Sequence, residues 1–277
     1  MIAVFLGLNL FLGYQWWLLQ KAVAVYSQPL SDQLANVQSE LATHGVTLKA
    51  PVPENQPVMP QLHVNYSPVS LRGLSSALWP RSVRVQWPGL SAHVINSPFG
   101  SIRITSPGQF MENLNPHFAA RQAKFPMKKL SQGLQKYLIK HGYNFASYQQ
   151  LATYQKGSQT TVIYVQQYNG YPIFSARLTA YLSHGQLQSI RQTSFNVLGA
   201  ANPRQVSSPI SALLSLSQYM DKADLNADNT IQDIRLGYYS SVISDHGWYL
   251  APVWRIDTTL GVFYVNAVTG EVGVGVA

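Results

Sequence analysis

The chain begins with an unbroken hydrophobic segment. Residues 1–19 contain no charged side chain and consist mostly of aliphatic and aromatic residues. Built as a helix, with a rise of about 1.5 Å per residue, this segment would be roughly 28 Å long, close to the ~30 Å hydrocarbon core of a bilayer. Tyr14, Trp16 and Trp17 lie near its end, where interfacial aromatic residues are common, and Lys21 follows. We therefore predict a transmembrane anchor over residues 1–19.

A cleaved signal peptide is the competing interpretation of this segment, with Ala22-Val23-Ala24 as the cleavage site. Signal peptides carry a basic region before the hydrophobic run and small residues near the cut. No Lys or Arg precedes this run, and two Trp residues and Lys21 lie close to the proposed site. These features favour an anchor. Because the usual positive charge on the cytoplasmic side is missing, we also expect a translation start upstream of Met1.

Two residues inside the predicted anchor are unusual for a lipid-facing helix. Asn9 and Gly13 are four positions apart, so they share one helix face. Glycine permits close approach of a second helix, and the amide of Asn9 offers hydrogen bonds that lipid cannot satisfy. We predict that Asn9 and Gly13 bind a partner helix within the membrane. The alternative is that Asn9 bonds its own backbone and Gly13 is merely tolerated.

Beyond the anchor, apolar residues recur at helical spacing in three segments. The predicted helices run from residue 31 to a stop at Gly45, from 127 to 141 before Gly142, and from 210 to 220. Residues 50–60 contain four prolines and predict an extended connector. The remaining apolar segments have the period of two that is typical of strands. Strands are predicted at 62–66, 82–87, 92–96, 101–105, 161–168, 173–182, 187–197, 234–242, 248–257 and 261–267.

Alternation within the predicted strand at 173–182 assigns its two faces. Leu178, Ala180 and Leu182 fall on one face. Arg177, Thr179 and Tyr181 fall on the other. The predicted helices alternate along the chain with groups of strands, and adjacent strands are joined by tight turns. This order predicts an α+β protein with antiparallel sheets and packed helices. We divide the chain into the anchor (1–19), an amphipathic helix and connector (20–50), and two modules at 51–122 and 123–277.

Composition excludes several kinds of site. The 277 residues include no cysteine, which rules out disulfides, thiolate metal sites and cysteine nucleophiles. Hydrophobic residues make up 46%, enough for a buried core, whereas charged residues are only 11% and give a net charge of +8. The densest basic cluster, Arg121, Lys124, Lys128 and Lys129, has no flanking aromatic platform. Nucleic acid is therefore not an expected partner, and weak attraction to an anionic membrane or cell wall fits better.

One loop partly matches a calcium-binding pattern. Asp224, Asn226, Asp228 and Thr230 have the spacing of the first EF-hand ligands. The sixth position, usually Gly, is Asn229, and the twelfth, usually a bidentate Glu, is Arg235. Since a cation replaces the closing anion, we predict no metal site here.

Other catalytic patterns are also missing from the sequence. The seven histidines are scattered singly, and neither a nucleophile elbow nor a phosphate-binding loop occurs. The sequence leaves open that carboxylates meet in space, as Asp245 and Asp257 could across a hairpin. We predict no catalytic residues, no cofactor and no enzymatic activity.

Three stretches resemble the YycI family. The segment NLFLGYQW (9–16) is similar to the end of its membrane anchor, and QYNGYPIF (167–174) is similar to its central strand pair. LGYY (236–239), LAPVWRI (250–256) and YVNAVTGE (264–271) resemble its C-terminal strands in the same order. The resemblance is good over 128–272 and at the anchor, and only general over 51–122.

The resemblance implies a single-pass cell-membrane protein with most of the chain extracytoplasmic. It further implies contact with the sensor histidine kinase of the YycG/WalK type, which governs cell-wall metabolism, and with a YycH-type protein. The NGYPIF and NAVTGE pieces also resemble PepSY and propeptide domains. That second resemblance suggests a rival hypothesis, a secreted PepSY-like peptidase inhibitor. A third hypothesis is a basic cell-wall-binding module.

Overall fold

The computed structural model describes residues 30–79, 93–122, 124–143, 145–223, 228–242, 244 and 247–275. The predicted anchor at 1–19 and the predicted strand at 82–87 lie outside these residues and stay predictions. Among the described helices, none combines the length and the apolar character needed to cross a membrane.

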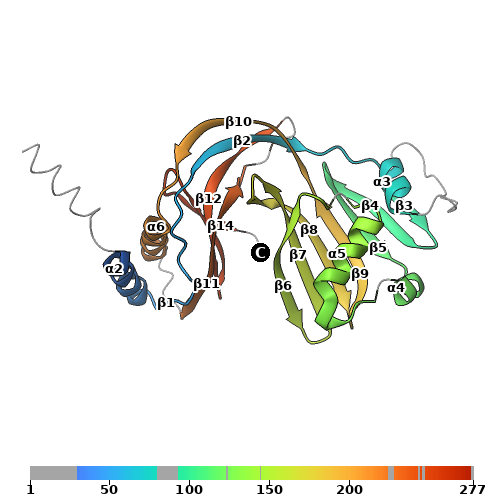
Figure 1. Ribbon diagram of the computed structural model, residues 1–277, viewed down its shortest axis with the longest axis horizontal. Coiled ribbons are helices and arrows are strands. Elements are labelled where there is room, and N and C mark those ends of the chain that lie inside the picture. Colours follow the sequence, from blue (N-terminus) through green and yellow to red (C-terminus); the bar gives the residue numbers. More distant parts are fainter. Residues whose placement is uncertain are drawn as a thin grey trace, which may run out of the picture.

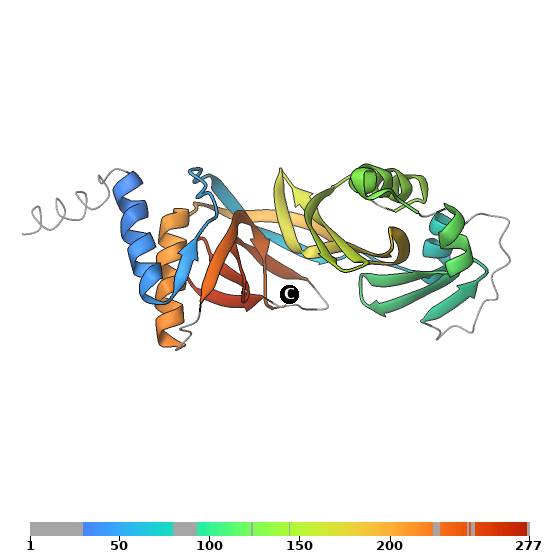
Figure 2. The ribbon, with the colours of Figure 1, turned by 90° about the horizontal axis from the view of Figure 1, so that it is seen from below.

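Two lobes lie next to each other along the long axis of the molecule (Figures 1 and 2). We call them the terminal lobe, from residues 30–66 and 195–275, and the inserted lobe, from residues 69–193. The terminal lobe contains α2 (Leu30–Thr43), β1 (Val46–Leu48), β2 (Val58–Tyr66), β10 (Phe195–Gln205), α6 (Pro209–Lys222), β11 (Asn229–Tyr239), β12 (Trp248–Thr258), β13 (Gly261–Asn266) and β14 (Val272–Gly275). The inserted lobe contains α3 (Leu71–Leu78), β3 (Val94–Ser97), β4 (Gly100–Ser106), β5 (Gln109–Leu114), α4 (Pro116–Gln122), the 3-10 turn η1 (Met127–Lys129), α5 (Leu130–Lys140), β6 (Tyr148–Lys156), β7 (Gln159–Tyr168), β8 (Tyr171–Ser183) and β9 (Gln186–Thr193).

One hydrogen-bonded network of strands runs through both lobes, in the order β10-β2-β12-β11-β8-β9-β5-β4-β3. Most neighbours are antiparallel, so the predicted α+β class with antiparallel sheets is confirmed. The parallel pairs are β1 with β11 and β11 with β8. The second of these joins the lobes through a single register pair, Tyr238 with Ile173.

Each lobe has its own hydrophobic core. In the terminal lobe, α2 and α6 contribute Leu41 and Leu213, which pack with Trp254 of β12. In the inserted lobe, Leu134 and Leu138 of α5 belong to the core that also contains Leu178, Ala180 and Ile190. A smaller cluster of Leu151, Val165, Phe174, Val253 and Tyr264 contains residues from both lobes, and we call it the junction cluster. The predicted modules at 51–122 and 123–277 rest on sequence alone. In the structure, the core of the inserted lobe has members on both sides of that boundary, from Leu78 to Ile190.

The three predicted helices are present as α2, α5 and α6. The α6 helix begins with Pro209 in its first turn, and the side chain of Ser208 accepts a hydrogen bond from the Ser211 amide. This cap explains why the helix starts immediately after the extended segment that precedes it.

Several predicted boundaries are wrong: the strand predicted at 234–242 is β11, Asn229–Tyr239, and two further differences have a clear reason. The connector predicted to extend to Pro60 ends earlier, since β2 already begins at Val58. Pro60 is tolerated because it lies opposite the register shift between Ala201 and Arg204 of β10, where no ladder bond from its nitrogen is needed. The single strand predicted at 187–197 is two strands, β9 and β10, in different lobes. Alternation continues across Ser194 without Gly or Pro, so the sequence contains no turn signal at this point.

Candidate functional site

The residues predicted to bind a partner helix lie outside the described part of the chain. Asn9 and Gly13 belong to residues 1–29, so their shared helix face stays a prediction. Asp245, proposed as a carboxylate partner of Asp257, also lies outside it.

The loop that partly matches a calcium pattern is described only from Asp228 onward. Arg235, at the closing position of that pattern, forms an ion pair of 2.5 Å with Asp233 and donates to the Leu151 carbonyl oxygen at 3.2 Å. In the described residues, no group of three or more His, Asp or Glu side chains is placed to hold a metal ion.

A cleft of about 660 Å³ lies between the lobes, and we call it the interlobe cleft. One wall is a face of the inserted-lobe sheet, from β5 to β9, and the other is formed by β11, β12 and β13. Three arginines line it, Arg177, Arg191 and Arg255, and none of the described lining residues is acidic. Its volume lies within the range of roughly 300–1,000 Å³ that is common for ligand sites.

The period-two pattern of β8 creates the inserted-lobe wall. Leu178 and Ala180 are fully buried in the core under α5, whereas Arg177, Thr179 and Tyr181 line the cleft. The two faces predicted from the sequence are confirmed. The polar face stays open because the helices of this lobe cover only the other side of its sheet (Figure 1).

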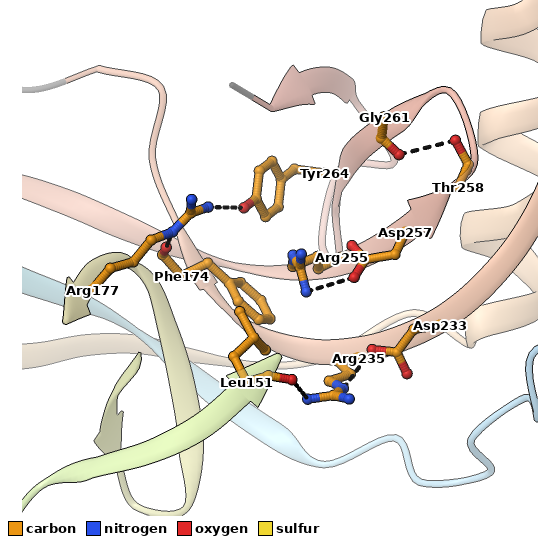
Figure 3. Close-up of polar contacts among 10 residues, drawn as sticks. All are labelled: Leu151, Phe174, Arg177, Asp233, Arg235, Arg255, Asp257, Thr258, Gly261 and Tyr264. Atoms are coloured by element: carbon orange, nitrogen blue, oxygen red, sulfur yellow. Dashed lines mark hydrogen bonds and ion pairs between the residues drawn. The ribbon is translucent and has the colours of Figure 1, made fainter. Parts of the chain in front are cut away.

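A break in the pairing of β8 positions Arg177. Val165 of β7 pairs with Arg177, but the next β7 residue, Gln166, pairs with Ile173, so residues 174–176 have no partner in β7. This bulge frees the Phe174 carbonyl oxygen, which accepts a bond of 2.6 Å from Nε of Arg177. Nη2 of the same guanidinium donates to the Tyr264 hydroxyl of the terminal lobe at 3.3 Å (Figure 3). Arg177 therefore connects the lobes at the floor of the cleft.

Arg255 is the most deeply buried charged residue of the cleft, with 4% of its surface exposed. Its Nη1 lies 2.8 Å from Oδ2 of Asp257, and its Cζ lies 5.5 Å from the centre of the Phe174 ring (Figure 3). Within the described structure, Nε of Arg255 and Oδ1 of Asp257 have no hydrogen-bond partner. A buried ion pair with unsatisfied atoms is costly, since desolvation is only partly offset.

The charges around Asp257 explain its electrostatic state. Burial raises the pKa of the Asp257 carboxyl, and the nearby Arg255 guanidinium opposes this shift. In the β11–β12 register, Asp233 lies opposite Asp257 and Arg235 opposite Arg255, so like charges face each other across the strands. Each ion pair consequently runs along its own strand, between residues two positions apart. These four charges sum to zero, and Arg177 and Arg191 leave the cleft positive.

The sequence analysis did not predict this site, although the sequence contains a pattern that indicates part of it. Arg255 and Asp257 interrupt a hydrophobic run at alternate positions, between Trp254, Ile256 and Thr258. Charged residues at two positions on one face of a buried strand indicate a paired or functional cluster. Arg177 approaches this cluster because of the β8 bulge. No residue type in β8 predicts that bulge, so the position of Arg177 could not be predicted.

Comparisons with known proteins show the family and the fold. A sequence profile described as "YycI protein" matches residues 26–268. A search of curated proteins found no match. An uncharacterized protein from Eubacterium rectale is similar in structure, with a TM-score of 0.53, 10% identity, and coverage of 87% of this chain and 98% of that chain. YycH from Bacillus subtilis is also similar, with a TM-score of 0.51, 14% identity, and coverage of 77% of this chain and 53% of that chain.

At these sequence identities the structural likeness demonstrates a shared fold, but not a shared function. The profile match is more specific, because it extends over both lobes, from before α2 to the end of β13. The chain belongs to the YycI family.

Proposed function

We propose that this protein is a membrane-anchored, extracytoplasmic regulator of a sensor histidine kinase of the YycG/WalK type. It acts by protein contact, together with a YycH-type partner. The observation that carries the proposal is the family match over residues 26–268. The fold shared with YycH from Bacillus subtilis supports the grouping of the two proteins on which the proposal rests.

The chemistry of the interlobe cleft favours binding over catalysis. Its charged lining groups are guanidiniums, which stay protonated in proteins and therefore cannot exchange protons as general acids or bases. Burial raises the pKa of the neighbouring Tyr264 phenol, which keeps that hydroxyl protonated as well. Such groups orient and hold anions.

The extent of the match also bears on the rival hypotheses. The resemblance to PepSY and propeptide domains rests on two short segments, whereas the YycI match includes the helices and both lobes. We therefore favour the kinase regulator over a secreted peptidase inhibitor or a cell-wall-binding module.

Co-purification from native membranes tests the proposal. An epitope-tagged full-length chain is expressed from its own locus, and the membranes are crosslinked, solubilised and captured. We expect the tag in the membrane fraction after an alkaline wash, with the sensor kinase and a YycH-type protein enriched over an untagged strain. Recovery of the mature protein in the culture medium together with a peptidase would contradict it.

A further inference from the structure

The interlobe cleft holds positive charge that the described residues leave without a counterion. Arg177 and Arg191 line it, and neither forms an ion pair with a described carboxylate. Arg191 is exposed, whereas Arg177 is half-buried and held in place by the Phe174 carbonyl and the Tyr264 hydroxyl. Fixed guanidiniums lose little freedom on binding and recognise carboxylates through paired hydrogen bonds.

Unsatisfied polar atoms are buried in the same cleft. Nε of Arg255 and the hydroxyl of Ser175 have no hydrogen-bond partner among the described residues, and both side chains line the cleft. Buried donors are nearly always paired, because losing water without replacement is unfavourable. Both groups can donate, so they suit an acceptor oxygen that enters from the cleft.

The spacing of the arginines limits the shape of the ligand. Thr179 of β8 pairs with Arg191 of β9, so Arg177, two residues before Thr179, is the diagonal neighbour of Arg191 on the same face. Diagonal neighbours in an antiparallel sheet are about 7–8 Å apart. In an extended peptide, side chains on one face are about 6.6 Å apart, since each residue advances ~3.3 Å.

We infer that the interlobe cleft binds an extended acidic peptide whose alternate carboxylates contact Arg177 and Arg191. A backbone carbonyl of the peptide accepts from Arg255 and Ser175 at the cleft floor. Exposed Tyr154 and half-buried Tyr239 provide flat surfaces on the two sides. This inference adds a ligand to the proposed function but does not depend on it, because peptide binding and kinase contact are measured separately.

Calorimetry with the full-length chain in mild detergent tests the inference with composition-matched peptides. The probes are Ac-Glu-Ser-Glu-Ser-Glu-NH2, its isomer Ac-Glu-Glu-Ser-Ser-Glu-NH2, which has no two glutamates at alternate positions, and Ac-Gln-Ser-Gln-Ser-Gln-NH2. We expect micromolar binding of the alternating acidic peptide, binding about fivefold or more weaker for the isomer, and none for the amide peptide. Arg191→Gln should weaken binding about tenfold or more, because a charge-assisted contact is lost.

Two further variants separate loss of binding from loss of fold. Arg177→Lys keeps the charge but not the planar fork, and we expect it to weaken binding as well. Arg204→Gln removes an exposed arginine of β10 outside the cleft and should leave the Kd unchanged. All variants are first checked for an unchanged unfolding midpoint.

Three results would overturn the inference: equal affinity for the acidic and amide peptides, no effect of Arg191→Gln, or full displacement by submillimolar inorganic phosphate or succinate. The last result would mean that the cleft is a general anion site or takes a small dicarboxylate.

Discussion

At the scale of single residues, the main energetic feature of the interlobe cleft is the free-energy cost of burying the charges of Arg255 and Asp257. Arg255 and Asp257 have side-chain exposures of 4% and 18%, whereas Arg235 and Asp233 on the adjacent strand have 42% and 32%. The same two residue types at the same spacing therefore form one buried and one exposed pair. Water screens the exposed pair, so the two pairs should differ strongly in their contribution to stability.

Alanine substitution separates the two pairs. Arg255→Ala leaves the Asp257 carboxylate buried without its partner, and we expect a loss of about 3–5 kcal/mol in the free energy of unfolding. Arg235→Ala on the neighbouring strand is the matched control, with an expected loss below about 1 kcal/mol. Urea unfolding followed by tryptophan fluorescence measures both. Equal losses would show that water reaches Arg255 as readily as Arg235.

Glu112 in the inserted lobe is a second buried charge, with 3% of its surface exposed. It accepts a hydrogen bond from Nε1 of Trp79 at 2.9 Å and another from the Tyr143 hydroxyl. Burial raises the pKa of its carboxyl above the usual 4.5, and the two hydrogen bonds only partly oppose this shift.

The sign of this shift predicts a pH dependence of stability. Because the folded-state pKa is raised, the contribution of Glu112 is fully present below pH 4.5 and is lost as the pH rises through the folded-state pKa. Glu112→Gln removes the ionisation, so its stability relative to wild type should increase with pH, by at most about 1.4 kcal/mol per pH unit. Urea midpoints from pH 4.5 to 8 measure this difference. Glu40→Gln, on an exposed face of α2, controls for the loss of one carboxylate. Parallel pH profiles for wild type and Glu112→Gln would refute the prediction.

At the scale of elements, β8 holds the lobes together. Its first part contributes Ile173 to the terminal core, its bulge contributes Phe174 to the junction cluster, and its second part belongs to the inserted lobe. The close approach of β11 to this strand depends on Gly237, since a Cβ at that position would lie 2.5 Å from the Pro172 carbonyl oxygen and 2.6 Å from the Phe174 ring.

A methyl group at Gly237 should therefore disturb the junction between the lobes. We expect Gly237→Ala to reduce the free energy of unfolding by about 1–3 kcal/mol through overpacking. Gly199→Ala on β10 is the control, because nothing lies within 4 Å of its Cβ position. Thermal unfolding compares the two variants. A thermal unfolding midpoint equal to that of wild type for Gly237→Ala would mean that β8 and β11 can move apart without a loss of stability.

Local patterns were sufficient to predict α2, α5, α6 and most strands, because each has a buried face that repeats at its own period, whereas the short helices α3 and α4 were not predicted. The helix at 127–141, which is η1 and α5 in the structure, and the two faces of β8 were predicted for this reason. The edge strand β6, whose residues 153–156 are all exposed, has too weak a pattern and was missed. The interlobe cleft was missed because Arg255 is 78 residues after Arg177, on a strand of the other lobe, and only the tertiary fold brings the two together.

At the scale of the whole molecule, we predict that the anchor at residues 1–19 supplies a partner contact separate from the lobes. We expect Asn9→Leu and Gly13→Leu to reduce co-purification with the sensor kinase, because an interhelical amide bond contributes roughly 0.6–2 kcal/mol in a membrane. Membrane insertion and the fold of the lobes should not change. Leu8→Ala, on another face of the predicted helix, is the control. Wild-type recovery of the kinase by both variants would assign recognition to the extracytoplasmic lobes.

The insertion of one lobe between β2 and β10 also sets an order of events during synthesis. Among the described strands, β2 pairs only with β10 and β12, and β1 only with β11, so residues 46–66 stay without these sheet partners until residues 195–258 have been made. At 5–20 residues per second, this delay is roughly 10–40 s. The inserted lobe, by contrast, contains its own strand partners from β3 to β9 and can fold in the meantime. For those seconds the buried side chains of β2, Met59, Leu62 and Val64, have no sheet partner to cover them, so the unfinished chain is exposed to aggregation at this strand.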